Sequence, residues 1–318
     1  MKTETERKPY AFGVDVGGTT VKLGLFRTDG TLLEVWQIPT RTEENGKNIL
    51  PDIAAEIKAM LQRKQIPAEE VEGIGLDVPG PVNAEGTVFK CINLGWGTFN
   101  VVSALQDLTG FRVKAGNDAN VAALGELWMG GGKGFQSIVM ITLGTGVGGG
   151  VVTEDGIISG FHGAAGEVGH ITVNEEETEC CGCGKKGCLE QYTSAKGVAT
   201  QMKRYLQLHP EVDSSLRQMK DFTAQEIFNE AKAGDAAALA VVDRTCALLG
   251  KAATTIACVV DPEAFVIGGG MSAAGDFLLD KMEASYRKYA FHASRDTAFR
   301  LCDLGNHAGI YGAVKMLL

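Results

Sequence analysis

The chain has 318 residues, and at roughly 100–200 residues per domain this length predicts two domains with substantial buried cores. Hydrophobic residues make up 45% of the chain and charged residues 22%, values near the globular average that exclude a disordered or collagen-like chain. With a net charge of −9 and no basic run, neither nucleic acid nor an anionic membrane is expected as a partner. No apolar stretch reaches the roughly 20 residues of a membrane span, and the first ten residues lack a signal-peptide core, so we expect a cytoplasmic protein.

The first predicted element is a β-hairpin with a glycine-containing turn. Residues 10–16 and 21–26 are apolar strands, and the turn between them consists of Gly17, Gly18, Thr19 and Thr20. Because glycine has no Cβ, the backbone N–H groups of such a turn can approach an anion closely. The threonine hydroxyls add donors, and the carboxylate of Asp15 suits a hydrated Mg²⁺. For this motif alone, an ordinary hairpin turn is an equally good interpretation.

The segments that follow alternate between helix and strand, which favours an α/β fold. Residues 49–65 place apolar side chains on one helical face, and residues 71–78 form a strand that leads into Pro-Gly-Pro at 79–81. A helix over residues 119–129 is opened by Asn117 and Asp118. Further on, Thr223 and Glu226 predict a capping box, residues 236–260 a long helix and residues 308–318 a terminal helix.

The hairpin pattern returns about 125 residues after its first occurrence, which predicts a duplicated architecture of two α/β domains facing a cleft. Residues 137–143 form a strand, residues 144–150 a glycine-rich turn, and residues 151–153 begin the return strand. Gly144, Thr145 and Gly146 would then form a second clamp for the phosphates of a nucleotide.

A third glycine run, Gly268, Gly269 and Gly270, follows the buried strand 264–267, as in nucleotide pockets of open α/β sheets. Neither a Walker P-loop nor a strand-linked Gly-x-Gly-x-x-Gly with a downstream acid occurs, so these two kinds of nucleotide site are disfavoured.

Cysteines crowd into residues 180–188 and indicate a metal site. His170, Cys181, Cys183 and Cys188 provide one imidazole and three thiolates, a set that suits tetrahedral Zn²⁺. Cys180 is the alternative to Cys181, although the Cys-x-Cys spacing favours Cys181. Four protein ligands would close the coordination sphere, so we expect a structural metal that holds the loop 166–190. The other four cysteines are predicted to be buried thiols: Cys91, Cys246, Cys258 and Cys302.

Three carboxylates are candidates for the chemistry. Asp118 lies at a helix start, where a capping role is the simpler interpretation, but a carboxylate facing a γ-phosphate is also the base that a hydroxyl nucleophile needs. Glu167 and Glu190 flank the cysteine loop; each is suited to bind a pair of sugar hydroxyls and each is equally well explained as a solvated surface charge.

The motifs occur in an order that resembles the ROK family of sugar kinases and repressors. They are Asp-Val-Gly-Gly-Thr-Thr (15–20), Gly-Asn-Asp-Ala-Asn (116–120), Leu-Gly-Thr-Gly-Val-Gly-Gly-Gly (143–150), Gly-Glu-Val-Gly-His (166–170) and the cysteine segment 181–190. Within the family, Asn-Leu-Gly-Trp (93–96) and Ile-Gly-Gly-Gly-Met-Ser (267–272) are most similar to ATP-dependent glucokinases of Gram-positive bacteria.

This resemblance implies an actin-like ATPase fold. A small domain (residues 1–117) would be joined by the final helix (306–318), and a large domain would span residues 118–305. It also implies transfer of the γ-phosphate of ATP to the 6-hydroxyl of glucose, with Mg²⁺, a structural Zn²⁺ and a homodimer.

The residues matching the family pattern acquire specific roles. Asp118 would accept the proton of the 6-hydroxyl, and His170 would bind zinc through one ring nitrogen and a sugar hydroxyl through the other. The remaining glucose ligands would be Gly80, Asn93, Asn117, Glu167 and Glu190. The phosphates would lie at residues 15–20 and 144–147, and the adenine side at the 268–271 turn, which includes Met271. Asp77 departs from the pattern, since a small residue is commoner there.

Alternative functions remain open at this stage. A kinase for N-acylmannosamine, mannose or fructose would use the same polar residues. A sugar-responsive repressor would need a DNA-binding segment, and the 14 residues before Asp15 are too few for a helix-turn-helix. A binding protein of the actin or chaperone type would not require the cysteine loop, and polyphosphate-dependent relatives generally lack it.

Overall fold

The computed structural model describes residues 7–318, which pack as two compact units. The first unit comprises the chain up to Gly134 together with Gly150–Ala165 and Asp303–Leu318; the second comprises Phe135–Gly149 and Gly166–Cys302. The helix that begins at Asp118 packs in the first unit. The expected domain division between residues 117 and 118 stays a prediction.

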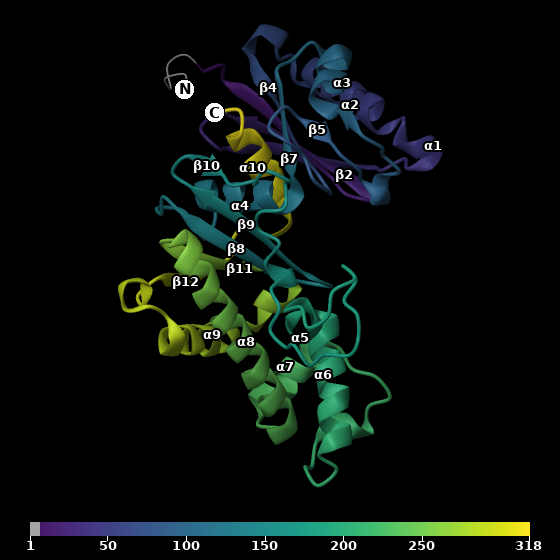
Figure 1. Ribbon diagram of the computed structural model, residues 1–318. Coiled ribbons are helices and arrows are strands. Elements are labelled where there is room, and N and C mark those ends of the chain that lie inside the picture. The colour runs from purple at the N-terminus through teal and green to yellow at the C-terminus, as the bar shows by residue number, and fades with distance from the viewer. Residues whose placement is uncertain (1–6) are drawn as a thin grey trace. The chain divides into compact units, whose positions relative to one another are not determined.

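The first unit contains one complete five-stranded sheet, the helices that cover it (Figure 1) and the two-stranded sheet β5-β6. With η denoting a short 3₁₀ helix, its elements are β1 (Tyr10–Val16), β2 (Thr20–Arg27), β3 (Leu32–Pro39), α1 (Glu43–Gly46), α2 (Ile49–Lys64), η2 (Ala68–Glu70), β4 (Val71–Val78), β5 (Thr87–Val88), η3 (Ile92–Leu94), β6 (Phe99–Asn100), α3 (Val101–Thr109), β7 (Val113–Asn117), α4 (Asp118–Met129), β10 (Gly156–Ile157), η8 (Gly305–His307) and α10 (Ala308–Lys315).

The sheet of this unit has the strand order β3-β2-β1-β4-β7. Strands β1, β4 and β7 are parallel, whereas β2 and β3 run antiparallel to their neighbours. Alternate residues such as Phe12 and Val14 pack with Ile53 of α2 and Leu105 of α3, so these two helices cover one face. The carboxyl ends of the three parallel strands therefore meet at one edge, the usual place for a ligand site.

Helix α10 covers the other face of the same sheet (Figure 1). A Cβ at Gly13 would lie 2.1 Å from the backbone oxygen of Ile310, and one at Gly75 would lie 1.8 Å from that of Ala313. Only glycine permits this approach, so the helix backbone rests directly on β1 and β4. Helix α4 packs against the outer side of α10.

The second unit holds most of the other sheet, whose order is β10-β9-β8-β11-β12. Strands β8, β11 and β12 are parallel. Its elements are β8 (Ile138–Leu143), β9 (Val147–Thr153, which continues into the first unit), η4 (Val168–His170), α5 (Glu190–Thr193), α6 (Ala195–Leu208), η5 (Ser215–Gln218), α7 (Ala224–Ala233), α8 (Ala236–Val260), β11 (Ala264–Gly268), η6 (Gly270–Ala274), α9 (Asp276–Tyr289), η7 (His292–Ser294) and β12 (Ala298–Leu301).

Most predicted elements are confirmed within one or two residues, including both hairpin strands at the N-terminus, the long helix α8 and the capping box of Thr223 and Glu226. The second glycine turn is shorter than predicted, because β9 begins at Val147 and its glycines 148–150 are strand residues. The prediction of four buried cysteines was wrong for Cys258, which is exposed, and for Cys302, which is half-buried. Helix α8 presents one face to solvent, and Cys258 lies on that face.

Glu126 of α4 is a completely buried carboxylate that makes no ion pair within residues 7–318. Its oxygens accept hydrogen bonds from the backbone N–H groups of Gly131, Asp303 and Leu304, at 2.9, 3.0 and 3.0 Å. Charge-assisted bonds of this kind offset the cost of burial. Glu126 thus holds the segment leaving α4 and the segment entering α10 in fixed positions.

Within the described part of the chain, no helix combines the length and the apolar character needed to cross a membrane.

Candidate functional site

The β1–β2 turn forms the first part of the candidate site. The N–H of Gly17 donates to the carbonyl of Thr20 at 3.0 Å, and the hydroxyl of Thr40 donates to the carbonyl of Gly17 at 2.7 Å. These bonds fix the turn, while Gly18, Thr19 and Thr20 stay exposed to solvent. Asn93 lies beside Gly18, since a Cβ at Gly18 would be 3.7 Å from the Cβ of Asn93.

Two carboxylates lie side by side beneath this turn. Asp15 of β1 is the register partner of Asp77 of β4, and both face α10, where a Cβ at Gly309 would lie 2.6 Å from Oδ2 of Asp77 and 3.3 Å from Cγ of Asp15. Lys22 of β2 is 3.9 Å from Oδ2 of Asp15. The sequence therefore places a cation and two acids in one row across three strands.

Asp77 is only 1% exposed, and neither of its oxygens accepts a hydrogen bond from the described residues. Burial, together with the negative charges of Asp15 and Asp118, raises the pKa of Asp77 well above its ordinary value. A neutral Asp77 carries a proton that it can donate to Asp15. The protonated form also adds no second negative charge beside Asp15.

Asn117 and Asp118 follow directly from the end of β7, at the same edge of the sheet. Asn117, in extended conformation, is the N-cap of α4 and accepts from the N–H of Asn120. The capping interpretation of Asp118 is therefore wrong: Asp118 is the first helical residue. Its Oδ1 accepts from its neighbours, the amide of Asn117 at 2.9 Å and the N–H of Ala119 at 2.8 Å.

Gly80 adjoins this pair, because the side-chain amide of Asn117 also donates to the carbonyl of Gly80 at 3.2 Å. Its φ of 120° lies in the region that favours glycine, which explains the residue at the Pro-Gly-Pro loop. The structure thus gathers the predicted residues of the first unit at the carboxyl edge of β1, β4 and β7.

In the second unit, the turn of residues 144–146 is tied to Glu190 at the start of α5. Oε2 of Glu190 accepts the N–H of Val147 at 3.0 Å, and a Cβ at Gly146 would lie 2.3 Å from the same oxygen. The carbonyl of Gly144 accepts the N–H of Ala195 at 2.9 Å. Glu190, a candidate sugar ligand, is therefore hydrogen-bonded to the turn that is a candidate phosphate clamp.

The third glycine run leaves β11 at the carboxyl edge of the second sheet. Gly268 pairs with Thr142 in the parallel ladder, and Gly269, with φ 82°, packs against the backbone of Leu143 at the end of β8. Met271 is buried, whereas Gly269 and Gly270 are exposed. The turn therefore lies beside the start of the 144–146 turn, as two parts of one nucleotide site would require.

The predicted zinc ligands converge. The ligand atoms of His170, Cys181, Cys183 and Cys188 all lie within 4.8 Å of one another. Cys183 Sγ and Cys188 Sγ are 3.6 Å apart. A disulfide requires about 2.0 Å, whereas two thiolates on one tetrahedral zinc, with Zn–S bonds of about 2.3 Å, are about 3.8 Å apart. The geometry fits a metal, and the cluster contains Cys181 rather than the exposed Cys180.

The two nitrogens of His170 face different groups. Nδ1 is 3.9 Å from Sγ of Cys181, and Nε2 is 3.8 Å from Oε2 of Glu167. The side chain of Glu167 is 61% exposed. One ring nitrogen is therefore directed to the cysteines, and the other shares a partly exposed position with a carboxylate.

The thiols differ in acidity. Burial raises the pKa of Cys188 to about 12, whereas a hydrogen bond from the backbone N–H of Lys185 lowers the pKa of Cys183. Without a metal, the cluster therefore retains protons at neutral pH. Metal binding must release them, so the affinity of this cluster for zinc should fall in acid.

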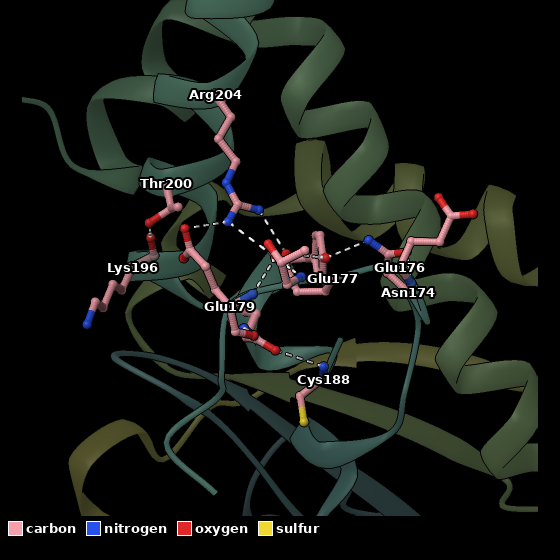
Figure 2. Close-up of polar contacts among 11 residues, drawn as sticks. Asn174, Glu176, Glu177, Glu179, Cys188, Lys196, Thr200 and Arg204 are labelled. Carbon is pink, nitrogen blue, oxygen red and sulfur yellow. Dashed lines mark hydrogen bonds and ion pairs between the residues drawn. The ribbon is translucent and has the colours of Figure 1, made fainter. Parts of the chain in front are cut away.

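The polar network beside the cysteine loop was not predicted from the sequence (Figure 2). Arg204 of α6 pairs with Glu177 at 2.8 Å and with Glu179 at 3.1 Å, and the hydroxyl of Tyr192 donates to Glu177 at 2.6 Å. Arg204 lowers the pKa of Glu177 to about 2. The pairing joins a helix to a loop distant in sequence, and no local pattern indicates it.

Comparison with known proteins places the chain among sugar kinases. The model of the ROK family matches residues 11–318. A glucokinase of Halalkalibacterium halodurans is 42% identical over 304 residues, covering 94% of this chain and 92% of the relative. Among solved structures, a ROK hexokinase from Thermus thermophilus has a TM-score of 0.79 and 28% identity, covering 96% of each chain.

A ROK family glucokinase from Streptomyces griseus, solved in complex with glucose and AMPPNP, has a TM-score of 0.71 and 30% identity, covering 96% of this chain and 98% of that chain. These matches confirm the expected actin-like α/β fold.

Proposed function

The chain belongs to the ROK family, and on that premise we propose that it is an ATP-dependent glucokinase, which transfers the γ-phosphate of ATP to the 6-hydroxyl of glucose. The observation that carries the proposal is the 42% identity to a glucokinase over nearly the whole of both chains. The clustering of the candidate residues within each unit supports it.

Asp118 acts as the general base. Its carboxylate follows directly from the end of β7, and two hydrogen bonds fix Oδ1. As the 6-hydroxyl attacks the γ-phosphorus in line, its proton passes to Asp118. The bond from the γ-phosphorus to the β,γ-bridging oxygen breaks, and that oxygen leaves with ADP. Asn117 serves twice in this arrangement, because it caps α4 and holds the carbonyl of Gly80.

The other hydroxyls of glucose are assigned to Asn93, Asn117, Glu167, His170 and Glu190. Carboxylates suit this task because each accepts two hydrogen bonds from a hydroxyl pair. Glu190 also accepts the N–H of Val147, so sugar binding at Glu190 is coupled to the position of the 144–146 turn.

Residues 15–20 and 144–146 bind the phosphates, and residues 268–271 the adenine side. The donor set fits an anion, since each turn presents backbone N–H groups or hydroxyls, and Asp15 fits Mg²⁺, which prefers carboxylate oxygens and water. When bound, Mg²⁺ neutralises charge on the phosphates. Asp15 and the turn then keep the γ-phosphate in position for attack.

The cysteine cluster binds Zn²⁺ in a structural role. Three thiols and Nδ1 of His170 supply four ligands, which leaves no open position for a zinc-bound water. The metal fixes the loop so that Nε2 of His170 and the carboxylate of Glu190 stay oriented. Metal analysis of freshly purified protein should find about one zinc per chain.

The proposal is tested by ADP release from Mg-ATP in the presence of glucose, mannose, fructose, N-acetylmannosamine or no sugar. We expect strong turnover with glucose and little without sugar. Faster turnover with another hexose would show that this hexose, and not glucose, is the substrate. No turnover with any sugar, in protein that contains zinc and binds ATP, would refute the kinase proposal. A homodimer remains part of the proposal, and light scattering measures it.

A further inference from the structure

A cavity of about 300 Å³ lies between α6 and α8 in the second unit, apart from every residue assigned above to glucose, ATP or zinc. Its volume is at the lower end of the range for small-molecule sites, roughly 300–1,000 Å³. The helices α6 and α8 form two walls, and Asn174 and Tyr192 lie at the end nearest the cysteine loop. A small molecule therefore fits this cavity.

The charged groups that line the cavity are two arginines. Arg204 of α6 and Arg244 of α8 line it, and no Asp or Glu of the described residues does; His209, which also lines it, lies 3.2 Å from Oε1 of Glu211. Arg204 is paired with acids, whereas Arg244, which is exposed to solvent, forms neither an ion pair nor a hydrogen bond with any residue in 7–318. A guanidinium without a partner beside a cavity is suited to a carboxylate or phosphate group, which it binds through two parallel hydrogen bonds.

The cavity also contains an unused donor. The side-chain nitrogen Nε2 of Gln201 is buried and has no hydrogen-bond acceptor among the described residues. Buried donors in folded proteins are nearly always satisfied, so an unpaired one needs a partner that the chain itself does not provide. An oxygen of a bound anion would supply the acceptor once the amide turns toward the cavity that Gln201 lines.

The remaining wall is apolar. Leu208, Val241, Leu248 and the ring of Tyr205 line it, and Leu208 is largely exposed to solvent. A fully hydrated inorganic ion would make no apolar contacts with these side chains. The combination of a cationic end and an apolar wall selects an organic anion with an apolar body.

We propose that this cavity is a regulatory site for a small organic anion with an apolar body, whose anionic group binds Arg244 and Gln201, and that Arg204 connects it to the sugar site. Arg204 lines the cavity and, on its other side, a second cavity of about 180 Å³ that Thr145, Cys181 and Glu190 also line. The guanidinium holds Glu177 and Glu179, which lie four and two residues before Cys181 in the loop (Figure 2).

The cavity and the sugar site are connected because a bound anion and the two glutamates compete for the guanidinium of Arg204. The side chain of Glu177 is 5% exposed; Arg204 and Tyr192 donate to it, and the backbone N–H groups of Thr178 and Glu179 donate to its Oε1. An anion in the cavity attracts Arg204 away from Glu177 and Glu179, so the segment 177–179 loosens and the adjacent Cys181 and Glu190 lose support. The ligand favours the state with the released loop, and by reciprocity it weakens glucose binding. This second step rests on the proposed glucokinase function.

Binding is tested first, without sugar or ATP, so that its outcome does not depend on the proposed function. Calorimetry uses phenyl phosphate and benzoate as anions with an apolar body, benzyl alcohol as the neutral body and inorganic phosphate as the bare anion. We expect saturable binding of phenyl phosphate, benzoate or both, and which of them binds more tightly distinguishes a phosphate ester from a carboxylate. Saturable binding of neither, or equally tight binding of benzyl alcohol, would overturn the proposal.

Variants locate the site. Arg244→Met and Gln201→Leu should each weaken binding by roughly ten-fold or more, the loss expected for a charge-assisted hydrogen bond. Arg295→Met, which removes an exposed arginine elsewhere in the second unit, is the matched control and should bind as the parent protein does. Unchanged affinity in both cavity variants would place the anion elsewhere and refute the assignment.

The connection to the sugar site is then measured in steady-state kinetics. The tighter of the two anions should raise KM for glucose by roughly five-fold or more in the parent protein and leave it unchanged in Arg244→Met. An equal rise in Arg244→Met would show that the anion acts at the active site. A constant KM in the parent protein would refute the role of Arg204.

Discussion

Replacing the buried Asp77 by asparagine should change how the stability of the first unit depends on pH. The carboxyl of Asp77 is 1% exposed beside Asp15, and its pKa is raised well above the ordinary value of 3.8. Asparagine has nearly the same shape, keeps a donor for Asp15 and does not titrate. The substitution therefore isolates the proton on Asp77 from the packing around it.

The sign and size follow from linkage. A carboxyl whose pKa is raised on folding contributes stability that is fully present below its unfolded pKa, near 3.8, and is lost as the pH rises through its folded pKa. Across that interval the loss is about 1.4 kcal/mol per pH unit. The free energy of unfolding of the parent protein, minus that of Asp77→Asn, should decrease with this slope from about pH 4 upward and level off above the folded pKa.

Urea unfolding between about pH 4 and pH 9, followed by tryptophan fluorescence, measures this difference. All three tryptophans lie in the first unit, so the signal reports the unit that contains Asp77. Asp107→Asn, an exposed position on α3, is the control for simple loss of charge. A difference between parent and Asp77→Asn that stays constant over the whole range would refute the buried, protonated state of Asp77.

Three further predictions concern the site. Asp118→Asn should lower kcat by roughly 10²–10⁴-fold with little change in glucose affinity, because a general base acts in the transition state; a near-normal kcat would remove Asp118 from that role. Cys183→Ser should lose zinc and glucose binding together, as measured by metal analysis and calorimetry. The control Cys258→Ser, which replaces an exposed thiol outside the cluster, should keep both. If zinc-free Cys183→Ser still binds glucose, the metal does not support the sugar site. Gly146→Ala places a methyl group 2.3 Å from Oε2 of Glu190, so it should raise KM for both substrates by roughly ten-fold or more, and an unchanged KM for both would contradict the shared role of this turn.

The parts of the site that sequence analysis predicted are those whose determinants are local. The glycine turns follow apolar strands directly, and the cysteines of the cluster lie within eight residues of one another. His170 is only eleven residues before Cys181. In such segments the spacing itself limits the possible geometry, so residue type and order are sufficient.

The parts that escaped prediction depend on segments that meet from distant places in the chain. Asp77 is buried because the first turn of α10, at Gly309, lies against it. Glu126 is buried by residues 303–304, which likewise come much later in the sequence. Asn117 and Asp118 are both good capping residues, and only the extended backbone of Asn117 decides which of them caps α4.

The position of α10 also affects how the protein is made. Its backbone rests on β1 and β4 through Gly13 and Gly75, yet it is synthesised after the whole second unit, roughly ten to thirty seconds later than α4 at ordinary elongation rates. During that interval one face of the first sheet emerges from the ribosome without its cover. Chaperone binding to the nascent chain should therefore concentrate on this sheet and end when residues 303–318 have been added.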